Sequence, residues 1–118
     1  MSDTNIADLE MVRGDTKVYD VAFNSEDING VLTPINDPGA TYRWTVRDGQ
    51  RNIVFTGTAH QYVPGHAWMV INPSDTSGLP DHDVGLEYDV QVTETGGRVT
   101  TVQEGSLVVK VDMSVLTP

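Results

Sequence analysis

Apolar and polar residues alternate without interruption through residues 40–47. This period of two is typical of a half-buried β-strand, which has one apolar face and one face in water. Trp44, one of the chain's two tryptophans, lies in the middle of the apolar face. We therefore predict that this strand is central and that the rest of the chain covers Trp44. Its apolar positions are Ala40, Tyr42, Trp44 and Val46.

The same alternation predicts further strands along the chain. Residues 86–93 give the second clearest pattern, and we expect them to lie beside residues 40–47. Glycine, proline, asparagine and aspartate separate the segments, as is typical of turns. The other predicted strands are residues 9–12, 17–24, 52–58 and 67–72, and a closing segment, 98–103 and 107–111, interrupted at Gly105.

Two connections complete the predicted fold. Residues 25–39 are rich in turn dipeptides, contain a short edge segment around Val31 and Leu32, and could cross between two sheets. Residues 72–79 combine a capping residue, a proline and a closing glycine, which predicts one short helical turn. About seven short strands with almost no helix predict an all-β, two-sheet antiparallel β-sandwich. The predicted structural core is Tyr19, Val21, Phe23, Tyr42, Trp44, Val46, Phe55, Leu86, Tyr88, Val90 and Val92.

The composition fits a single domain, residues 1–118, with short arms at residues 1–8 and 113–118. The chain has no cysteine, which excludes a thiol nucleophile, a thiolate zinc site and a disulfide framework. Its formal net charge of −10 should repel nucleic acid and anionic membranes. No segment has the length of a membrane span, and the first residues lack a signal-peptide pattern, so we expect a protein made and kept in the cytoplasm.

The middle of the sequence, residues 41–74, is locally basic, because it has three arginines and a single acidic residue, Asp48. Arg43 and Arg47 fall on the wet face of the central strand, and Glu87 and Asp89 fall on the wet face of its expected neighbour. Side by side, the two strands would bring these charges within reach of each other. We predict ordinary cross-strand ion pairs between them.

The tripeptide Arg13-Gly14-Asp15 has two interpretations. It could be an integrin-type adhesion motif, which requires an exposed loop that holds the arginine and the carboxylate apart. A tight turn between two strands uses the same residue types, because glycine and aspartate favour bends. We expect the turn.

Metal binding and catalysis have weak candidates only. Residues 81–83, Asp-His-Asp, together with Asp75 and with His60 or His66, offer ligand types that a divalent cation accepts, but their spacing matches no established site. A solvated acidic loop is the expected interpretation. The serines and histidines fall in no catalytic motif. We therefore expect no catalytic residue, no metal and no cofactor.

Some apolar positions do not fit the main core. Val18, Val54, Met69 and Ile71 fall on the opposite strand faces, where they could form a docking surface or a second core layer. The two arms carry apolar residues as well. The predicted interface residues are Met1, Ile6, Met69, Ile71, Met113 and Leu116.

An ordered set of short motifs extends over residues 9–112, and through it the chain resembles a known family. It is similar to the small immunoglobulin-like β-sandwich proteins and domains of tailed-bacteriophage virions, including the amino-terminal domains of phage baseplate upper proteins. One departure is Leu86, where the family often has an aromatic residue. The motifs are Arg13-Gly14-Asp15-Thr16, Gly39-Ala40-Thr41 with Val46-Arg47, Gly85-Leu86-Glu87-Tyr88-Asp89-Val90, and Gly97-Arg98-Val99-Thr100-Thr101 with Glu104-Gly105.

The resemblance implies an immunoglobulin-like fold and a structural, non-enzymatic role in the virion. The size of the chain best suits a capsid decoration or cement protein, present in many copies on the major capsid protein. The alternative is a tail, neck or baseplate subunit that contacts tail proteins. From a different class, a module that binds a host-surface glycan or protein stays open, with Tyr62 and Trp68 as its available aromatic residues.

Overall fold

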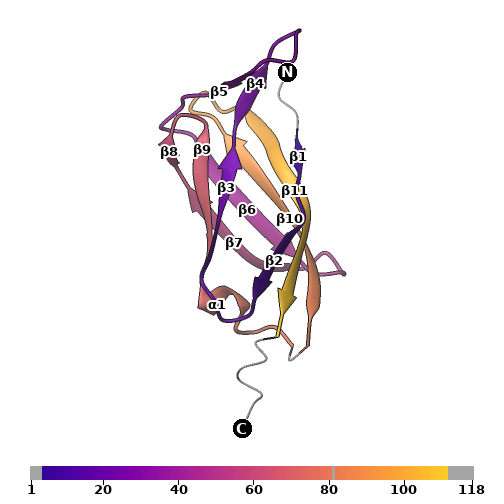
Figure 1. Ribbon diagram of the computed structural model, residues 1–118. Helices are drawn as coiled ribbons and strands as arrows, with labels where there is room; N and C mark the ends of the chain where they lie inside the picture. Colours follow the sequence, from indigo (N-terminus) through magenta and orange to yellow (C-terminus); the bar gives the residue numbers. More distant parts are fainter. Residues whose placement is uncertain (1–3, 81, 112–118) are drawn as a thin grey trace.

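The computed structural model describes residues 4–80 and 82–111, and its chain is all-β. The larger sheet has the order β1-β11-β10-β6-β7, and β2 also pairs with β11 (Figure 1). A second sheet has the order β3-β9-β8, and β4 and β5 form a separate hairpin. The elements are β1 (Asn5–Ile6), β2 (Leu9–Val12), β3 (Lys17–Ala22), β4 (Asn24–Glu26), β5 (Leu32–Pro34), β6 (Thr41–Arg47), β7 (Ile53–Ala59), β8 (Gln61–Val63), β9 (His66–Ile71), α1 (Pro73–Thr76), β10 (Val84–Thr93) and β11 (Val99–Lys110).

The two larger sheets pack face to face around one core, with β6 and β10 paired as predicted. The structure buries ten of the eleven predicted core side chains. The remaining one, Tyr19, is half-buried at the margin of the core, where its hydroxyl donates a hydrogen bond to the carbonyl of Glu10 at 2.8 Å. Tyr19 therefore links β3 of one sheet to β2 of the other.

The assignment of Met69 and Ile71 to an interface is wrong. Both side chains are fully buried, because β9 turns Ala67, Met69 and Ile71 toward the large sheet. Trp68, between them, faces outward. Both faces of β9 are apolar in sequence, so alternation alone does not determine which face lies inside. The packing of the two sheets does.

The prediction of a wholly antiparallel fold is also wrong at the amino terminus. Strands β1 and β2 run parallel to β11, so part of the predicted arm is a strand of the large sheet. Thr4 and Ala7 hold it there: the Thr4 hydroxyl donates to the Thr101 carbonyl, and the Ala7 amide donates to the Glu104 carbonyl. The predicted carboxy-terminal arm, 113–118, lies outside the described residues.

The predicted interruption at Gly105 does not occur, because β11 continues through it. An ideal Cβ at this position would collide with the Ala7 carbonyl, so glycine lets the amino-terminal segment approach the sheet. The strand is irregular elsewhere. A register shift opposite Val90 and Gln91 turns two successive residues, Val102 and Gln103, into the interior.

The predicted helical turn is α1, at the end of the molecule opposite the β4–β5 hairpin (Figure 1). Its Asp75 carboxylate accepts a hydrogen bond from the Asn72 amide at 2.8 Å. The buried Thr76 hydroxyl accepts one from the Gly14 amide at 3.1 Å. Across the described part of the chain, no helix has the length and apolar character of a membrane span.

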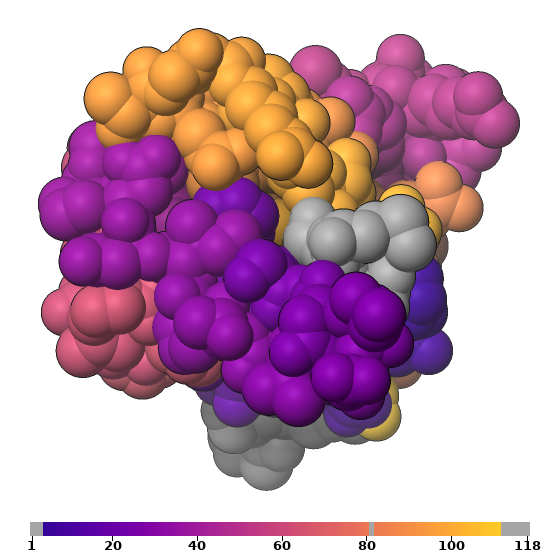
Figure 2. Space-filling model, turned by 90° about the horizontal axis from the view of Figure 1, so that it is seen from above, coloured from indigo at the N-terminus to yellow at the C-terminus, as the bar shows by residue number. Residues whose placement is uncertain are grey.

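The molecule is elongated, with extents of 56 × 23 × 22 Å. The β4–β5 hairpin stands at one end of the long axis, and it lies toward the viewer when the molecule is seen from that end (Figure 2). The ends of the molecule and the outer faces of both sheets are therefore the surfaces on which a site can be sought.

Candidate functional site

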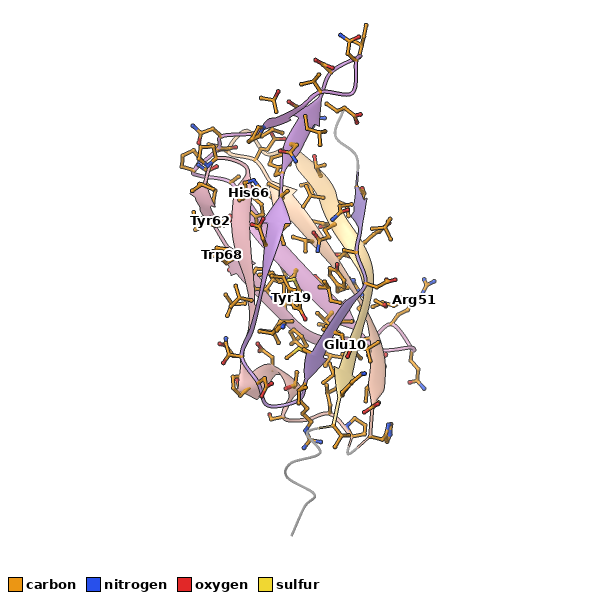
Figure 3. The ribbon with its side chains drawn as sticks, viewed as in Figure 1. Glu10, Tyr19, Arg51, Tyr62, His66 and Trp68 are labelled. Atoms are coloured by element: carbon orange, nitrogen blue, oxygen red, sulfur yellow. The ribbon has the colours of Figure 1, made fainter. Side chains whose placement is uncertain are left out.

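Four side chains form a compact aromatic patch on the outer face of the small sheet. We define the aromatic patch as Asp20, Tyr62, His66 and Trp68, from β3, β8 and β9 (Figure 3). The rings of Tyr62 and Trp68 stack with centroids 4.2 Å apart and an interplanar angle of 4°. Both residues stay more than two-fifths exposed, at 44% and 43%. A flat aromatic surface is therefore open to solvent.

Tyr62 and Trp68 lie on either side of the turn that joins β8 to β9. Gly65 adopts a left-handed backbone, with φ of 77°, and its carbonyl accepts a hydrogen bond from the Phe23 amide at 2.7 Å. The pairing of β8 with β9 is irregular between Gln61 and Val63. Tyr62 lies at that irregularity, and its ring contacts Trp68.

Asp20 fixes the polar edge of the patch. One carboxylate oxygen accepts a hydrogen bond from the Tyr62 hydroxyl at 2.9 Å, and the other lies 3.0 Å from Nδ1 of His66. Desolvation and then this hydrogen bond to Asp20 raise the pKa of Tyr62 above its ordinary value. The patch thus presents a rigid ring pair beside a carboxylate and an imidazole, an arrangement suited to binding.

Aliphatic side chains extend the same face. Val18 is 48% exposed and lies opposite Val70, which is partly buried, in the pairing of β3 with β9. The outer face of an antiparallel sheet in water normally carries polar residues. The outer face of the small sheet departs from this pattern, because it carries both an aromatic pair and valines.

The outer face of the large sheet carries an acidic hollow of about 450 Å³. Arg47 lines it and forms an ion pair with Asp89, with 3.2 Å between Nη1 and Oδ2. The register agrees with the predicted neighbourhood of these charges. Glu87 lies directly opposite Arg47, whereas Arg43 lies directly opposite Gln91 and diagonally from Asp89.

The Arg13-Gly14-Asp15 tripeptide forms the tight turn between β2 and β3. Gly14 has φ of 86°, and the Asp15 amide donates to the Val12 carbonyl. The Arg13 guanidinium donates to the Pro80 carbonyl at 3.2 Å, and so lies against the chain rather than extending into solvent. This geometry favours the turn over an adhesion motif.

The described residues of the acidic segment, His82 and Asp83, show no metal geometry. Asp81 lies outside the described residues; Asp83 accepts a hydrogen bond from the Val111 amide at 3.0 Å. His60 lies 2.9 Å from the Ala40 carbonyl, and His66 belongs to the aromatic patch. Among the described residues, no cluster of three or more histidines and carboxylates is arranged to hold a metal ion.

The remaining predicted interface residues are only partly placed. Ile6, on β1, is 66% exposed, while Met1, Met113 and Leu116 lie outside the described residues. The sequence interpretation missed Ile28, which is 99% exposed at the end of the β4–β5 hairpin. An isolated apolar residue among turn formers was the available signal.

Neither a scan against protein-family models nor a search of curated proteins finds a match for this chain.

Proposed function

We propose that the chain is a structural, non-enzymatic subunit of a tailed-bacteriophage virion, most simply a capsid decoration or cement protein bound to the coat lattice. The observation that carries this proposal is the apolar outer face of the small sheet, where Val18, Tyr62 and Trp68 are exposed together. A subunit that works by surface complementarity needs such a face. The ordered motifs that resemble those of virion proteins support the virion as the assembly.

We further propose that the two packed sheets form an immunoglobulin-like β-sandwich. Support comes from the single core that both sheets share and from the antiparallel pairing of β10 with β6 and of β6 with β7. The parallel strands β1 and β2 are an addition at the edge of that arrangement.

Quantitative mass spectrometry of purified virions tests the proposed role. Because virions are symmetric, a subunit of the coat lattice is present in a number of copies on the order of hundreds, and a tail, neck or baseplate subunit in a small multiple set by tail symmetry. A high copy number supports decoration. A low one supports the tail alternative, and absence from virions contradicts both.

The contact face can be tested in the same virions. Trp68→Ala removes the ring on which Tyr62 stacks, so we expect reduced incorporation of the subunit. The matched control is Val99→Ala, since Val99 is also exposed, at 56%, but lies on β11 of the other sheet. Equal incorporation of the two variants would show that the aromatic patch is not part of the contact surface.

A second function, binding of a host-surface glycan, is favoured by one observation. The stacked pair of Tyr62 and Trp68 has hydrogen-bonding groups of Asp20 and His66 beside it. The apolar C–H faces of a sugar ring pack on aromatic rings, and its hydroxyls bond to adjacent polar groups. Sedimentation with isolated host cell walls tests this: retention that is lost in Trp68→Ala supports it, and no retention of the wild-type protein contradicts it.

A further inference from the structure

The β4–β5 hairpin presents apolar side chains at the far end of the molecule. We define the hairpin tip as Ile28, Val31 and Leu32, which are 99%, 56% and 58% exposed. The hairpin extends beyond the two packed sheets along the long axis (Figure 1). A protein that approaches this end of the molecule along the long axis therefore meets the tip first.

One side chain holds the turn at the tip through two hydrogen bonds. A single carboxylate oxygen of Asp27 accepts hydrogen bonds from the amides of Asn29, at 2.8 Å, and Val31, at 3.0 Å. The backbone closes the turn, since Asp27 and Val31 bond through amide and carbonyl and Gly30 adopts φ of 80°. A pre-organised apolar projection loses little entropy on binding, which suits insertion into a pocket.

The base of the hairpin is fixed as firmly. The Ile35 amide donates to the Phe23 carbonyl at 2.9 Å, and the Phe23 amide donates to Gly65. Beside the hairpin lies a hollow of about 370 Å³, bordered by Leu32 and by Thr4 near β1. A partner can therefore surround the tip and also fill the adjacent depression.

The charge around the tip defines the chemistry of that partner. Between Lys17 and Arg43 the sequence has no lysine or arginine but has four acidic residues, two of them at the hairpin: Glu26 and Asp27. A second copy of this chain is a poor match, because its own hollow on the large sheet is acidic and its net charge is −10. A complementary partner carries lysine or arginine around an apolar pocket.

We propose that the hairpin tip inserts into an apolar pocket, rimmed by lysine or arginine, on a different protein. The proposal rests on the proposed function in one respect: it takes that protein to be the neighbouring subunit of the virion. Ile28 is the central anchor, and Asp27 both shapes the turn and faces the basic rim. This contact is separate from the aromatic patch, which lies on the side of the molecule (Figure 3).

Competitive incorporation tests the proposal. Cells infected with phage that lacks this gene express wild-type and variant chains in equal amounts, and mass spectrometry of purified virions gives their ratio. Burying one isoleucine changes an equilibrium by about tenfold or more. We expect Ile28→Ser to be depleted by roughly that factor. The control Ile53→Ser changes a residue that is 60% exposed at the start of β7, next to the turn that carries Arg51 and away from the hairpin (Figure 3), and should incorporate like wild type.

Asp27→Asn tests the basic rim. The amide oxygen of asparagine still accepts the two turn hydrogen bonds, so the change removes charge and keeps the turn. We expect several-fold depletion of this variant that shrinks when virions assemble at higher ionic strength. If Asp27→Asn is incorporated as well as the wild-type chain, the proposal that lysine or arginine surrounds the partner's pocket is wrong.

The outcomes separate this proposal from the proposed function. Absence of the wild-type chain from virions contradicts the proposed function itself. A different outcome is that the wild-type chain is present in virions and Ile28→Ser is incorporated as well as the Ile53→Ser control. That outcome contradicts insertion of the tip but leaves the proposed function standing. Thermal unfolding of the purified variants checks their folding; because Ile28 is almost fully exposed, Ile28→Ser should unfold at the wild-type temperature. A dimer of the purified protein that Ile28→Ser abolishes would favour a second copy as partner and overturn the choice made here.

Discussion

The indole ring of Trp44 lies directly against the backbone of Gly57, its cross-strand neighbour on β7. An ideal Cβ at position 57 would collide with the ring atoms of the indole. Trp44 is 4% exposed and lies in the middle of β6, so this contact belongs to the core. Glycine thus makes the space in which the largest side chain of the central strand is buried.

Gly57→Ala should destabilise the protein, because its methyl group forces the Trp44 ring or the β7 backbone to move. Overpacking of this kind costs about 1–3 kcal/mol. Gly85→Ala is the matched control: Gly85 is also a strand glycine, on β10, and nothing lies within 4 Å of its Cβ position. Urea unfolding measures both variants. Equal stability of the two would mean that Trp44 repacks without cost.

Tyr88→Phe should destabilise the attachment of the amino-terminal strands. The Tyr88 hydroxyl donates to the Ala7 carbonyl at 2.6 Å and accepts from the buried side-chain amide of Gln103 at 2.9 Å. Removal of the hydroxyl leaves both groups short of a partner, which costs about 1–3 kcal/mol.

Urea unfolding and hydrogen exchange of the Ala7 amide measure the effect of Tyr88→Phe. The control is Tyr62→Phe, which removes a hydroxyl whose bond to Asp20 is exposed and should change stability much less. Unchanged exchange at Ala7 in Tyr88→Phe would show that the backbone pairing of β1 with β11 alone holds this segment.

The sequence predicts what depends on local periodicity. The alternation in residues 40–47 and 86–93 placed both strands and their inward faces correctly, since only one face of each is apolar. It failed on β9, where both faces are apolar, and the packing of the two sheets buries Met69 instead of Trp68. The contact between Trp44 and Gly57 depends on the register of β6 with β7, which includes a shift between Val46 and Arg47 that the alternation does not reveal.

The candidate site was only partly predictable for the same reason. Tyr62 and Trp68 could be named as available aromatic residues, but their stacking follows from an irregular register between β8 and β9. Asp20 could not be associated with them, because β3 is far from β8 and β9 in the sequence and becomes the neighbour of β9 only in the folded sheet. Ile28 had no periodic pattern around it, and its exposure becomes visible only when the hairpin is in place.

The ion pair of Arg47 with Asp89 should contribute little to stability. The two side chains are 37% and 30% exposed, and such pairs contribute about 0.2–1 kcal/mol. Arg47→Ala should therefore lower the free energy of unfolding by at most about 1 kcal/mol, with a smaller effect at high salt. Arg43→Ala is the control, because Arg43 lies on the same strand as Arg47 but directly opposite the uncharged Gln91 of β10. A larger loss in Arg43→Ala would contradict the assigned pairing.

Tyr42→Phe should leave stability unchanged or raise it by about 1 kcal/mol. Tyr42 is 1% exposed, and its buried hydroxyl has no hydrogen-bond partner within residues 4–80 and 82–111. Removal of the hydroxyl ends the cost of burying an unpaired polar group. The edge-to-face contact with Phe23, with ring centroids 6.3 Å apart, does not require it. Urea unfolding of Tyr42→Phe and Tyr88→Phe compares an unpaired buried hydroxyl with a paired one. A loss of stability in Tyr42→Phe would show that the Tyr42 hydroxyl has a hydrogen-bond partner.

Alkaline pH should destabilise the protein through its buried tyrosines, Tyr42 above all. Burial, with the nearby charges of Asp20 and Asp37, raises the pKa of Tyr42 from 10.0 to about 12. Burial also raises the pKa of Tyr88. Since the unfolded chain releases these protons at lower pH than the folded one, stability is complete below pH 10.0 and falls as the pH rises toward about 12.

The variant Tyr42→Phe isolates the largest contribution to this alkaline transition. Without the Tyr42 hydroxyl, unfolding releases one proton fewer between pH 10.0 and about 12, so the midpoint in urea should fall less steeply with pH than in wild type. Below pH 9 or so, where tyrosines are protonated in both states, the two proteins should show parallel pH dependence. Equal slopes throughout the alkaline range would contradict the raised pKa of Tyr42, and with it the burial of this hydroxyl between the two sheets.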